Sequence, residues 1–200
     1  MTDYFALLGQ RRRPWLDNGA LKESFLSLSA VTHPDKIALA DEPKKQAASK
    51  KFADLNAGYH CLLLPKLRLL HLIELERGAR PVEVREIPGP LADLFARIAS
   101  LCREADAFLA KKTKTVSPML QAQLFEEAQA WIEKLNRMQK ELNGFHDELL
   151  ARLKSLDAQW NADGCHRPEL LNDLENLYRL FSYFNRWNGQ AQERIIRLSL

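Results

Sequence analysis

Apolar residues recur at alternating spacings of four and three along residues 124–160, and this pattern limits the fold more than any other feature. The series is Leu124, Ala128, Trp131, Leu135, Met138, Leu142, Phe145, Leu149, Leu153, Leu156 and Trp160. Residues at these spacings fall on one side of an α-helix, so they form a single apolar stripe. We expect one long helix over 118–160 that packs along an antiparallel partner helix.

Two further apolar stripes flank this helix in the sequence. One runs through Leu91, Leu94, Phe95, Ile98, Leu101, Cys102, Ala105, Phe108 and Leu109. The other runs through Leu170, Leu174, Leu177, Phe181 and Phe184, meets Asn188 and Gly189 where an apolar residue should stand, and resumes at Ala191, Ile195 and Leu198. The second half of the chain therefore predicts a three-helix bundle over residues 91–200.

The first half predicts four shorter helices. Asp3 can cap the first helix and Asp17 the second, which ends at His33. A third helix is expected after a polar stretch that contains Pro43. Its apolar face would be Ala48, Phe52, Leu55, Tyr59 and Leu62. Pro65 suits the first turn of a fourth helix, which Gly78 can close.

Residues 79–90, "ARPVEVREIPGP", hold three prolines and a glycine between helical patterns. This composition is typical of a semi-rigid linker. We therefore expect an all-α chain in three parts: a helical hairpin domain at 1–78, a linker at 79–90, and the bundle at 91–200.

The composition argues against several classes of protein. The formal net charge is +3, and the whole excess lies in residues 1–78, which is too little for the concentrated basic face of a nucleic-acid-binding protein. Cys61, Cys102 and Cys165 are too far apart for a zinc or cluster site, and so sparse a set suits a reducing compartment. No apolar run approaches the ~20 residues that span a membrane. We expect a cytoplasmic protein that binds neither metal, membrane nor nucleic acid.

The sequence also holds no recognisable catalytic grouping. It has no glycine-rich phosphate loop, no nucleophile with a nearby base, and no carboxylate pair in a familiar setting. We interpret His60, His71, His146 and His166 as ordinary helix or turn residues. We therefore expect no enzymatic activity and no cofactor.

The tetrapeptide His33-Pro34-Asp35-Lys36 stands where the second helical pattern stops. A proline disfavours the helical conformation of the residue before it, so Pro34 ends the helix and forces a turn. Asp35 would then project from a rigid corner, with His33 and Lys36 as nearby hydrogen-bond donors. By itself, the same pattern would also fit a helical hairpin in which these residues only separate two helices.

The segments "DYFALLG", "LKESFLSLSAVTHPDK" and "FADLNAGYHCLL" resemble a J-domain in their order and spacing. The resemblance implies that Asp35 engages the ATPase side of a seventy-kilodalton heat-shock chaperone, and so couples client delivery to ATP hydrolysis. It places His33, Pro34, Lys36 and Lys22 in the same docking site.

The second helix departs from the family pattern in its charge. Family members usually present several Lys or Arg residues there, whereas this chain has Lys22 alone, and Thr32 stands where an aromatic residue is common. Either the chaperone partner is a specialised one, or other basic residues take over the role. The candidates are Arg11, Arg12, Arg13, Lys44 and Lys45, which could equally be ordinary solvated surface.

The fourth helical segment, "PKLRLLHLIELERG", is similar to the "P...RA.YLL...G" pattern of the HscB type of iron-sulfur co-chaperone. Pro65, Arg68 and Leu72 carry this resemblance, and Leu69 replaces the expected alanine. The likeness extends over the whole chain. It implies that the bundle binds the cluster scaffold protein through an exposed apolar patch with acidic residues.

Two apolar stripes of the bundle are candidates for binding this client. The first is Leu91, Leu94, Phe95 and Ile98, although the same stripe must also pack the bundle. The second, on the last helix, is Leu180, Tyr183 and Trp187.

The acidic content of the first bundle helix keeps two alternatives open. The family carries several glutamates there, whereas this chain has only Asp93, Glu104 and Asp106. One alternative is a J-domain adaptor whose coiled-coil bundle binds a different client. The other is a purely structural helical protein in which the histidine-proline turn is incidental.

Overall fold

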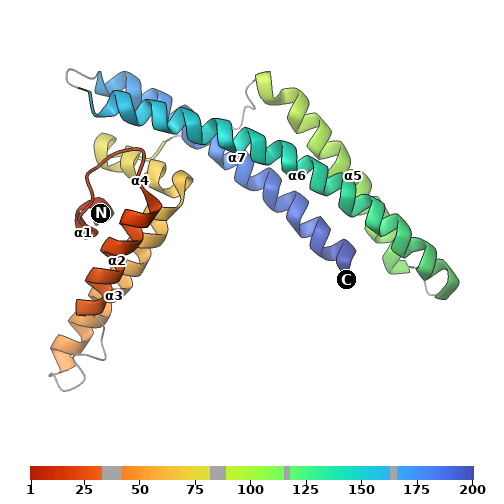
Figure 1. Cartoon of the computed structure of the whole chain (residues 1–200), viewed down its shortest axis with the longest axis horizontal. Helices are drawn as coiled ribbons and strands as arrows, with labels where there is room; N and C mark the ends of the chain where they lie inside the picture. Colours follow the sequence, from red (N-terminus) through yellow and green to blue (C-terminus); the bar gives the residue numbers. More distant parts are fainter. Residues whose placement is uncertain (33–41, 82–88, 115–117, 163–165) are drawn as a thin grey trace. The chain divides into compact units, whose positions relative to one another are not determined.

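A computed structural model describes residues 1–32, 42–81, 89–114, 118–162 and 166–200 of the chain (Figure 1). Within these ranges the secondary structure is helical and no strand occurs, which confirms the all-α class. The chain divides into two compact units. The first unit is Met1–Val82 with Leu150–Arg179, and the second is Glu83–Leu149 with Leu180–Leu200.

The predicted domain at 1–78 lies inside the first unit, which also takes in residues 150–179. Most of the predicted linker, residues 82–88, lies outside the described residues. The linker bounds at 79 and 90 therefore stay predictions.

The first two helices of the first unit begin with the N-terminal caps that the sequence predicts, Asp3 and Asp17. In α1 (Tyr4–Leu7), the Asp3 carboxylate accepts hydrogen bonds from the backbone N–H groups of Phe5 and Ala6 at 2.9 and 3.2 Å. In α2 (Asn18–Thr32), the Asp17 carboxylate accepts from the N–H of Ala20 at 2.8 Å. Both aspartates satisfy backbone donors that a helix start leaves unpaired, so both predicted caps are confirmed.

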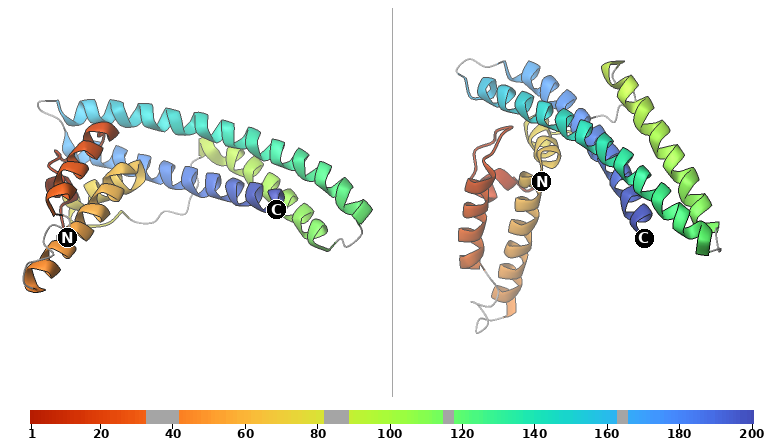
Figure 2. Two further views of the ribbon diagram at one scale, coloured as in Figure 1. Left: turned by 60° about the horizontal axis from the view of Figure 1, so that its bottom comes forward. Right: turned by 45° about the vertical axis from the view of Figure 1, so that its right-hand side comes forward.

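Helices α2 and α3 (Glu42–Leu63) lie side by side in every view (Figures 1 and 2). The rings of Phe25 and Tyr59 stack between them with centroids 4.4 Å apart. Leu21 of α2 and Leu55 of α3 are buried. Helix α3 starts before Pro43 rather than after it, because a proline costs no hydrogen bond in the first turn of a helix.

Helix α4 (Pro65–Arg77) follows with the predicted start and stop. Pro65 occupies its first turn, and Gly78 ends it with φ +72° while donating its N–H to the carbonyl of Glu74 at 2.9 Å. This left-handed conformation strains any residue with a Cβ, so glycine is the residue that fits.

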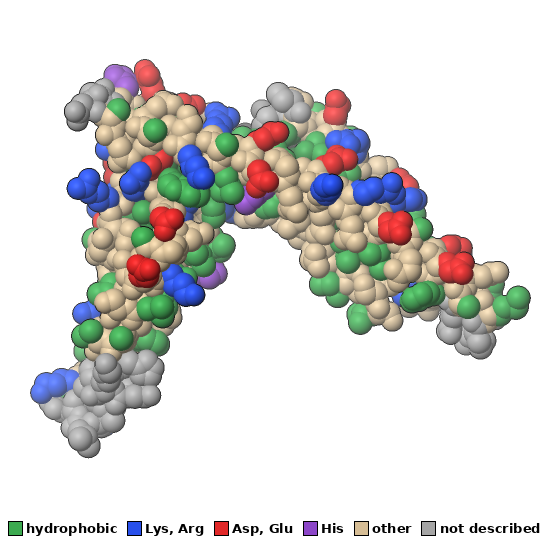
Figure 3. Space-filling view, in the orientation of Figure 1, with side chains coloured by type: hydrophobic (Ala, Val, Ile, Leu, Met, Phe, Trp, Pro, Cys, Tyr) green, Lys and Arg blue, Asp and Glu red, His purple; other side chains and the backbone are tan. Residues whose placement is uncertain are grey.

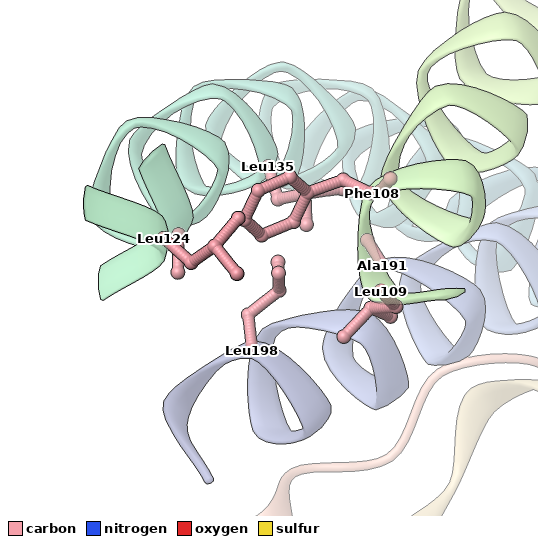
Figure 4. Close-up of a cluster of buried hydrophobic side chains, with 8 residues drawn as sticks. Phe108, Leu109, Leu124, Leu135, Ala191 and Leu198 are labelled. Carbon is pink, nitrogen blue, oxygen red and sulfur yellow. The ribbon is translucent and has the colours of Figure 1, made fainter. Parts of the chain in front are cut away.

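The second unit contains η2 (Gly89–Leu91), α5 (Ala92–Lys114), and parts of α6 (Pro118–Trp160) and α7 (Arg167–Ser199). Side chains of all three long helices meet in one apolar cluster (Figure 4). Its buried members are Ala105, Phe108 and Leu109 of α5, Leu124, Ala128 and Leu135 of α6, and Ala191 and Leu198 of α7. The predicted three-helix bundle is confirmed.

The polar interruption of the α7 stripe is satisfied from α6. The side-chain amide of Gln139 donates to the Asn188 side-chain carbonyl at 3.2 Å and to that of Gln192 at 2.9 Å. Apolar contact resumes at Ala191, which is 1% exposed. The seam therefore tolerates Asn188 because a facing helix supplies its partner.

Candidate functional site

The predicted docking tetrapeptide, His33-Pro34-Asp35-Lys36, lies outside the described residues, but both flanking helices are described. Thr32, at the end of α2, is buried, and its hydroxyl donates to the carbonyl of Leu28 at 2.7 Å. A threonine can thus stand where the family favours an aromatic residue, because the hydroxyl bonds back to its own helix. The hairpin fixes the two points between which residues 33–41 run.

The basic residues that the sequence offers for docking differ in their exposure and in their ion pairs. Lys22 is exposed on α2. Arg12 pairs with Asp3 at 2.8 Å and with Glu76 at 3.6 Å, and Arg13 pairs with Asp157. Of the five substitutes that the sequence offers, these two arginines are therefore held in ion pairs inside the first unit. Arg11 and Lys44 are exposed and Lys45 is half-buried.

Arg68 explains why the fourth helix carries an arginine in the family-like pattern. Its side chain is 1% exposed; Nε donates to the carbonyl of Pro14 at 2.8 Å, and Nη1 to that of Leu62 at 2.6 Å. The guanidinium lies 5.9 Å from the Trp15 ring centroid. Burial lowers the pKa of Arg68 to about 10. Arg68 therefore ties the loop after α1 to the last turn of α3.

Asp157 holds the same loop from the other side, and the sequence analysis does not identify it. This buried carboxylate near the end of α6 accepts from Nε of Arg13 at 3.0 Å, from a second guanidinium nitrogen of Arg13, and from the N–H of Trp15 at 3.0 Å. The indole N–H of Trp160 donates to the carbonyl of Arg12 at 3.0 Å. Residues 12–15 are thereby fixed by directional bonds rather than by apolar periodicity.

A second buried carboxylate joins α4 to α7 within the first unit. Glu175 pairs with Arg77 and, at 2.5 Å, with Arg179, and Arg77 also donates to the side chain of Asn172. Glu175 is buried between these partners. Arg77, at the end of α4, thus links α4 to α7, which the sequence pattern alone does not reveal.

His71 of α4 is a buried hydrogen-bond acceptor rather than an ordinary helix residue. Its Nε2 accepts from the backbone N–H of Tyr4 at 3.0 Å, and its ring lies 4.8 Å from that of Tyr4 and 5.8 Å from that of Phe5. Burial lowers the pKa of His71, which keeps the ring neutral as the bond requires. His71 therefore anchors the start of α1 onto α4.

In the second unit, the two predicted client-binding stripes meet. Phe95 of α5 faces Trp187 of α7 with ring centroids 6.1 Å apart, and Trp187 stacks on Tyr183 at 5.6 Å. Phe95 is 39% exposed, whereas Trp187 is 2% and Ile98 is 1% exposed. We call Phe95, Trp187 and Tyr183 the aromatic row. Its outer end is Phe95, and its other members contribute to the interior of the unit.

The remaining predicted client residues are partly covered. Leu91 of η2, Leu94 of α5 and Leu180 of α7 are half-buried. Each can therefore present part of its side chain to a partner while the rest packs against its own unit.

The acidic residues of α5 are only partly available for a partner. Asp93 is exposed. Asp106 pairs with Arg194 at 2.6 Å, and Glu104 accepts a hydrogen bond from the Ser100 hydroxyl at 3.0 Å. Two of the three carboxylates that the sequence offers for client binding are thus bonded within the unit.

The described parts of the chain contain no cluster of three His, Cys, Asp or Glu side chains able to hold a metal ion. Over the same residues, none of the helices combines the length and the apolar character that crossing a bilayer requires.

No protein-family model matches the chain. A co-chaperone protein HscB homolog from Pseudoalteromonas atlantica is 38% identical over 73 residues, which are 36% of this chain and 42% of that protein. The match therefore spans less than half the length of this relative. The HscB homolog from Vibrio atlanticus is 31% identical over 155 residues, which are 69% of this chain and 88% of the relative.

Two solved structures share the fold over nearly the whole chain. The chaperone HscB from Vibrio cholerae has a TM-score of 0.58 and 21% identity, covering 98% of this chain and 99% of that one. The human co-chaperone protein HscB has a TM-score of 0.61 and 16% identity, covering 96% of this chain and 81% of that one. At this level of identity the likeness establishes the fold: an N-terminal J-domain followed by a helical bundle.

Proposed function

The chain belongs to the HscB family of co-chaperones, and from this membership we propose that it stimulates the ATPase of a seventy-kilodalton heat-shock chaperone and delivers a client to it. The observation that carries the proposal is the sequence His33-Pro34-Asp35-Lys36 between α2 and α3. The docking site consists of this tetrapeptide and Lys22. No step of the proposal requires chemistry by this chain.

The hairpin supports the proposal physically. A carboxylate can engage a cationic partner with useful specificity only if its backbone is held, because ordering a free loop costs conformational entropy. The stacked rings of Phe25 and Tyr59 and the buried Leu21 and Leu55 hold α2 and α3 together. Asp35 would therefore act from a segment whose two ends are already fixed.

The test of docking is the substitution Asp35→Asn. We expect it to reduce stimulation of the chaperone ATPase by at least about tenfold, because it removes a charge-assisted hydrogen bond. Asp147→Asn, at an exposed aspartate of α6, is the matched control and should leave stimulation unchanged. Circular dichroism checks that both variants stay folded. Full stimulation by a folded Asp35→Asn variant would exclude this docking site.

For the client, we propose the iron-sulfur cluster scaffold protein, bound at the outer end of the aromatic row. The support is the 39% exposed side chain of Phe95, together with the half-buried Leu91, Leu94 and Leu180 of the same unit. Phe95→Ala should weaken capture of a purified scaffold protein by about tenfold, since aromatic residues dominate such contacts. Ile196→Ala, at another exposed apolar residue of the bundle, should not change the capture.

A different client remains the second candidate, and one observation favours it. The bonds from Arg194 to Asp106 and from Ser100 to Glu104 leave α5 with few acidic side chains for a basic partner. If stimulation of the ATPase depends on Asp35 while no scaffold protein is captured, the chain is a J-domain adaptor for another client. If the folded chain stimulates no such chaperone, it is a structural protein.

A further inference from the structure

Helix α6 has a flank in the second unit that α5 does not cover. The Gln139 side chain donates to Asn188 of α7 at 3.2 Å, so Gln139 marks the line along which α6 faces α7. Successive residues turn by about 100° around a helix. Trp131 therefore lies about 80° to one side of this line, where its ring meets that of Phe108 of α5 with centroids 6.3 Å apart. Phe125 lies about 40° to the other side, away from α5.

Helix α7 is arranged in the same way. Gln192, which accepts from the same side-chain amide of α6 at 2.9 Å, marks its facing line. Arg194 is turned about 160° towards α5, where its Nε donates to the carbonyl of Cys102 at 3.2 Å. Ile196 and Leu200 are turned the other way, by about 40° and about 80°. Both helices therefore carry apolar side chains on the flank that lies away from α5.

We call Phe125, Ile132, Ile196 and Leu200 the α6–α7 strip. Phe125 is 63%, Ile196 is 52% and Leu200 is 92% exposed, while Ile132 is half-buried against the apolar cluster. At about 1.5 Å per residue, Ile132 and Ile196 both lie roughly 10 Å from the Gln139 bonds along the bundle, so they stand at one level. The exposed parts add up to an apolar area on the order of 400 Å², and patches of that size often bind a partner.

Acidic side chains border the α6–α7 strip. Glu126 and Glu133 of α6 and Glu193 of α7 are exposed beside it. Arg197 also lies at this border, but it is 3.9 Å from both Glu193 and Asp106, which offset its charge. In the space-filling view, apolar side chains reach the surface over α6 and α7 with acidic side chains beside them (Figure 3). The border therefore favours a partner with basic side chains.

A second copy of the chain fits this flank poorly. Two strips placed face to face would bring carboxylates towards carboxylates, and like charges oppose association. The apolar area on each copy is also only about half of the ~800 Å² that each partner buries in a standard stable interface. A single added helix needs less area, because it binds through a few apolar residues at spacings of three and four.

We propose that the α6–α7 strip binds an amphipathic helix of a partner protein, whose apolar stripe is bordered by Lys and Arg residues. The stripe packs between Phe125 and Ile196, and the basic residues meet the acidic border. Arg137 and Lys140 follow on α6 only after the strip has ended, so they set the limit of this contact. The proposal goes beyond the proposed function, because the aromatic row meets α5 and the strip lies on the flank away from α5.

The probe is a pair of fluorescently labelled synthetic helices of about 18 residues, or five turns. Both carry the same leucine stripe, which is bordered by lysine in one peptide and by glutamate in the other. Fluorescence anisotropy measures the binding of each peptide to the full chain. We expect the lysine peptide to bind at least about tenfold more tightly, because its charges complement the border. Its binding should weaken as potassium chloride is raised from about 50 to about 300 mM.

Two pairs of variants test the residues. Phe125→Ala should raise the dissociation constant of the lysine peptide about tenfold. Leu120→Ala is the matched control and should leave binding unchanged, because Leu120 is 50% exposed on the same helix but is turned about 100° towards α5. Glu133→Gln should raise the dissociation constant about threefold, whereas Glu148→Gln, at an exposed residue further along α6, should not. Circular dichroism checks that all four variants stay folded.

Tighter binding of the glutamate peptide, equal losses for Phe125→Ala and Leu120→Ala, or no binding of either peptide would overturn the proposal. Sedimentation that shows a dimer of the full chain, dissociated by Phe125→Ala, would do the same, since a second copy would then cover the strip. Phe125→Ala should leave both ATPase stimulation and capture of the scaffold protein unchanged. If this variant instead abolishes capture, the strip belongs to the client surface and the proposal of a separate partner fails.

Discussion

The two compact units hold their helices together by different means. Among the described residues, every polar or charged residue that is buried belongs to the first unit: Thr32, Arg68, His71, Glu74, Asp157 and Glu175. The central cluster of the second unit is wholly apolar and comes from three long helices. The first unit adds directional bonds to its apolar core, whereas the second relies on an apolar seam.

The difference follows from what each unit has to position. The loop between α1 and α2 has no apolar periodicity, so side-chain donors and acceptors must hold it, as Arg68 and Asp157 do. Such bonds work at few distances and angles, and they specify one arrangement of the loop. An apolar seam accepts many shapes of similar volume, so it secures stability with less positional precision.

The largest loss of stability should come from removing side-chain volume from the apolar cluster of the second unit. Leu135 is fully buried in the cluster of the second unit, so Leu135→Ala leaves a cavity and should lower the free energy of unfolding by about 3 kcal/mol. Leu135→Met keeps the volume and should cost less than about 1.5 kcal/mol. Urea unfolding, followed by tryptophan fluorescence, measures both. Equal losses for the two variants would contradict the view that volume matters most in this unit.

In the first unit, removal of the buried hydrogen-bond acceptor Asp157 should lower the free energy of unfolding by nearly as much. Asp157→Ala leaves the N–H of Trp15 without its acceptor and Arg13 without its counterion, and should lower the free energy of unfolding by about 2 kcal/mol. The figure is moderate because the Arg13 side chain is 37% exposed and can recover solvation. Asp157→Asn keeps the size of the side chain but removes its charge. Its free energy of unfolding should therefore lie between that of the unchanged protein and that of Asp157→Ala.

Asp173→Ala serves as the control for Asp157→Ala. Asp173 lies 3.9 Å from Arg152 with both side chains about half exposed, so its removal should change the free energy of unfolding by less than about 0.5 kcal/mol. If Asp157→Ala is as mild as this control, directional bonds do not hold the loop.

The contrast between units also explains what the sequence could predict. Helix caps at Asp3 and Asp17, the stop at Gly78 and the apolar seam depend on residues close together in the chain, and all are confirmed. The Arg13 and Asp157 bond joins residues 144 positions apart, which no local pattern encodes. One signal was present: Asp157 directly follows Leu156 and lies four residues after Leu153 and three before Trp160, so it places a charge beside the apolar stripe.

The candidate client surface shows a different limit. Phe95 and Ile98 belong to one helical stripe in the sequence, yet one is 39% and the other 1% exposed. Periodicity identifies the face of a helix but not the place where the neighbouring helix ends, so it cannot separate core from partner surface. The docking tetrapeptide lies outside the described residues and stays a prediction.

The smallest expected effect is a pH dependence that belongs to the first unit. His71 accepts a hydrogen bond at Nε2 from the N–H of Tyr4, and a protonated ring cannot accept it. Burial lowers the pKa of His71 below its ordinary value of 6.5, although the nearby Asp3 and Glu74 partly oppose this. The folded state therefore binds the proton more weakly than the unfolded state does. Its contribution to stability is complete above pH 6.5 and is lost as the pH falls through the folded-state pKa.

His146 in the second unit provides the comparison, since burial also lowers its pKa, while its ring stacks on Phe184 at 4.5 Å. We expect the free energy of unfolding to decline by about 1 kcal/mol between about pH 7.5 and about pH 5. His71→Gln should remove more of this decline than His146→Gln, because stacking survives protonation better than an accepted hydrogen bond does. Urea unfolding of both variants at the two pH values measures the difference. If His146→Gln flattens the profile more, the proton-sensitive anchor lies in the apolar unit, and the division between directional and apolar stabilisation does not extend to the histidines.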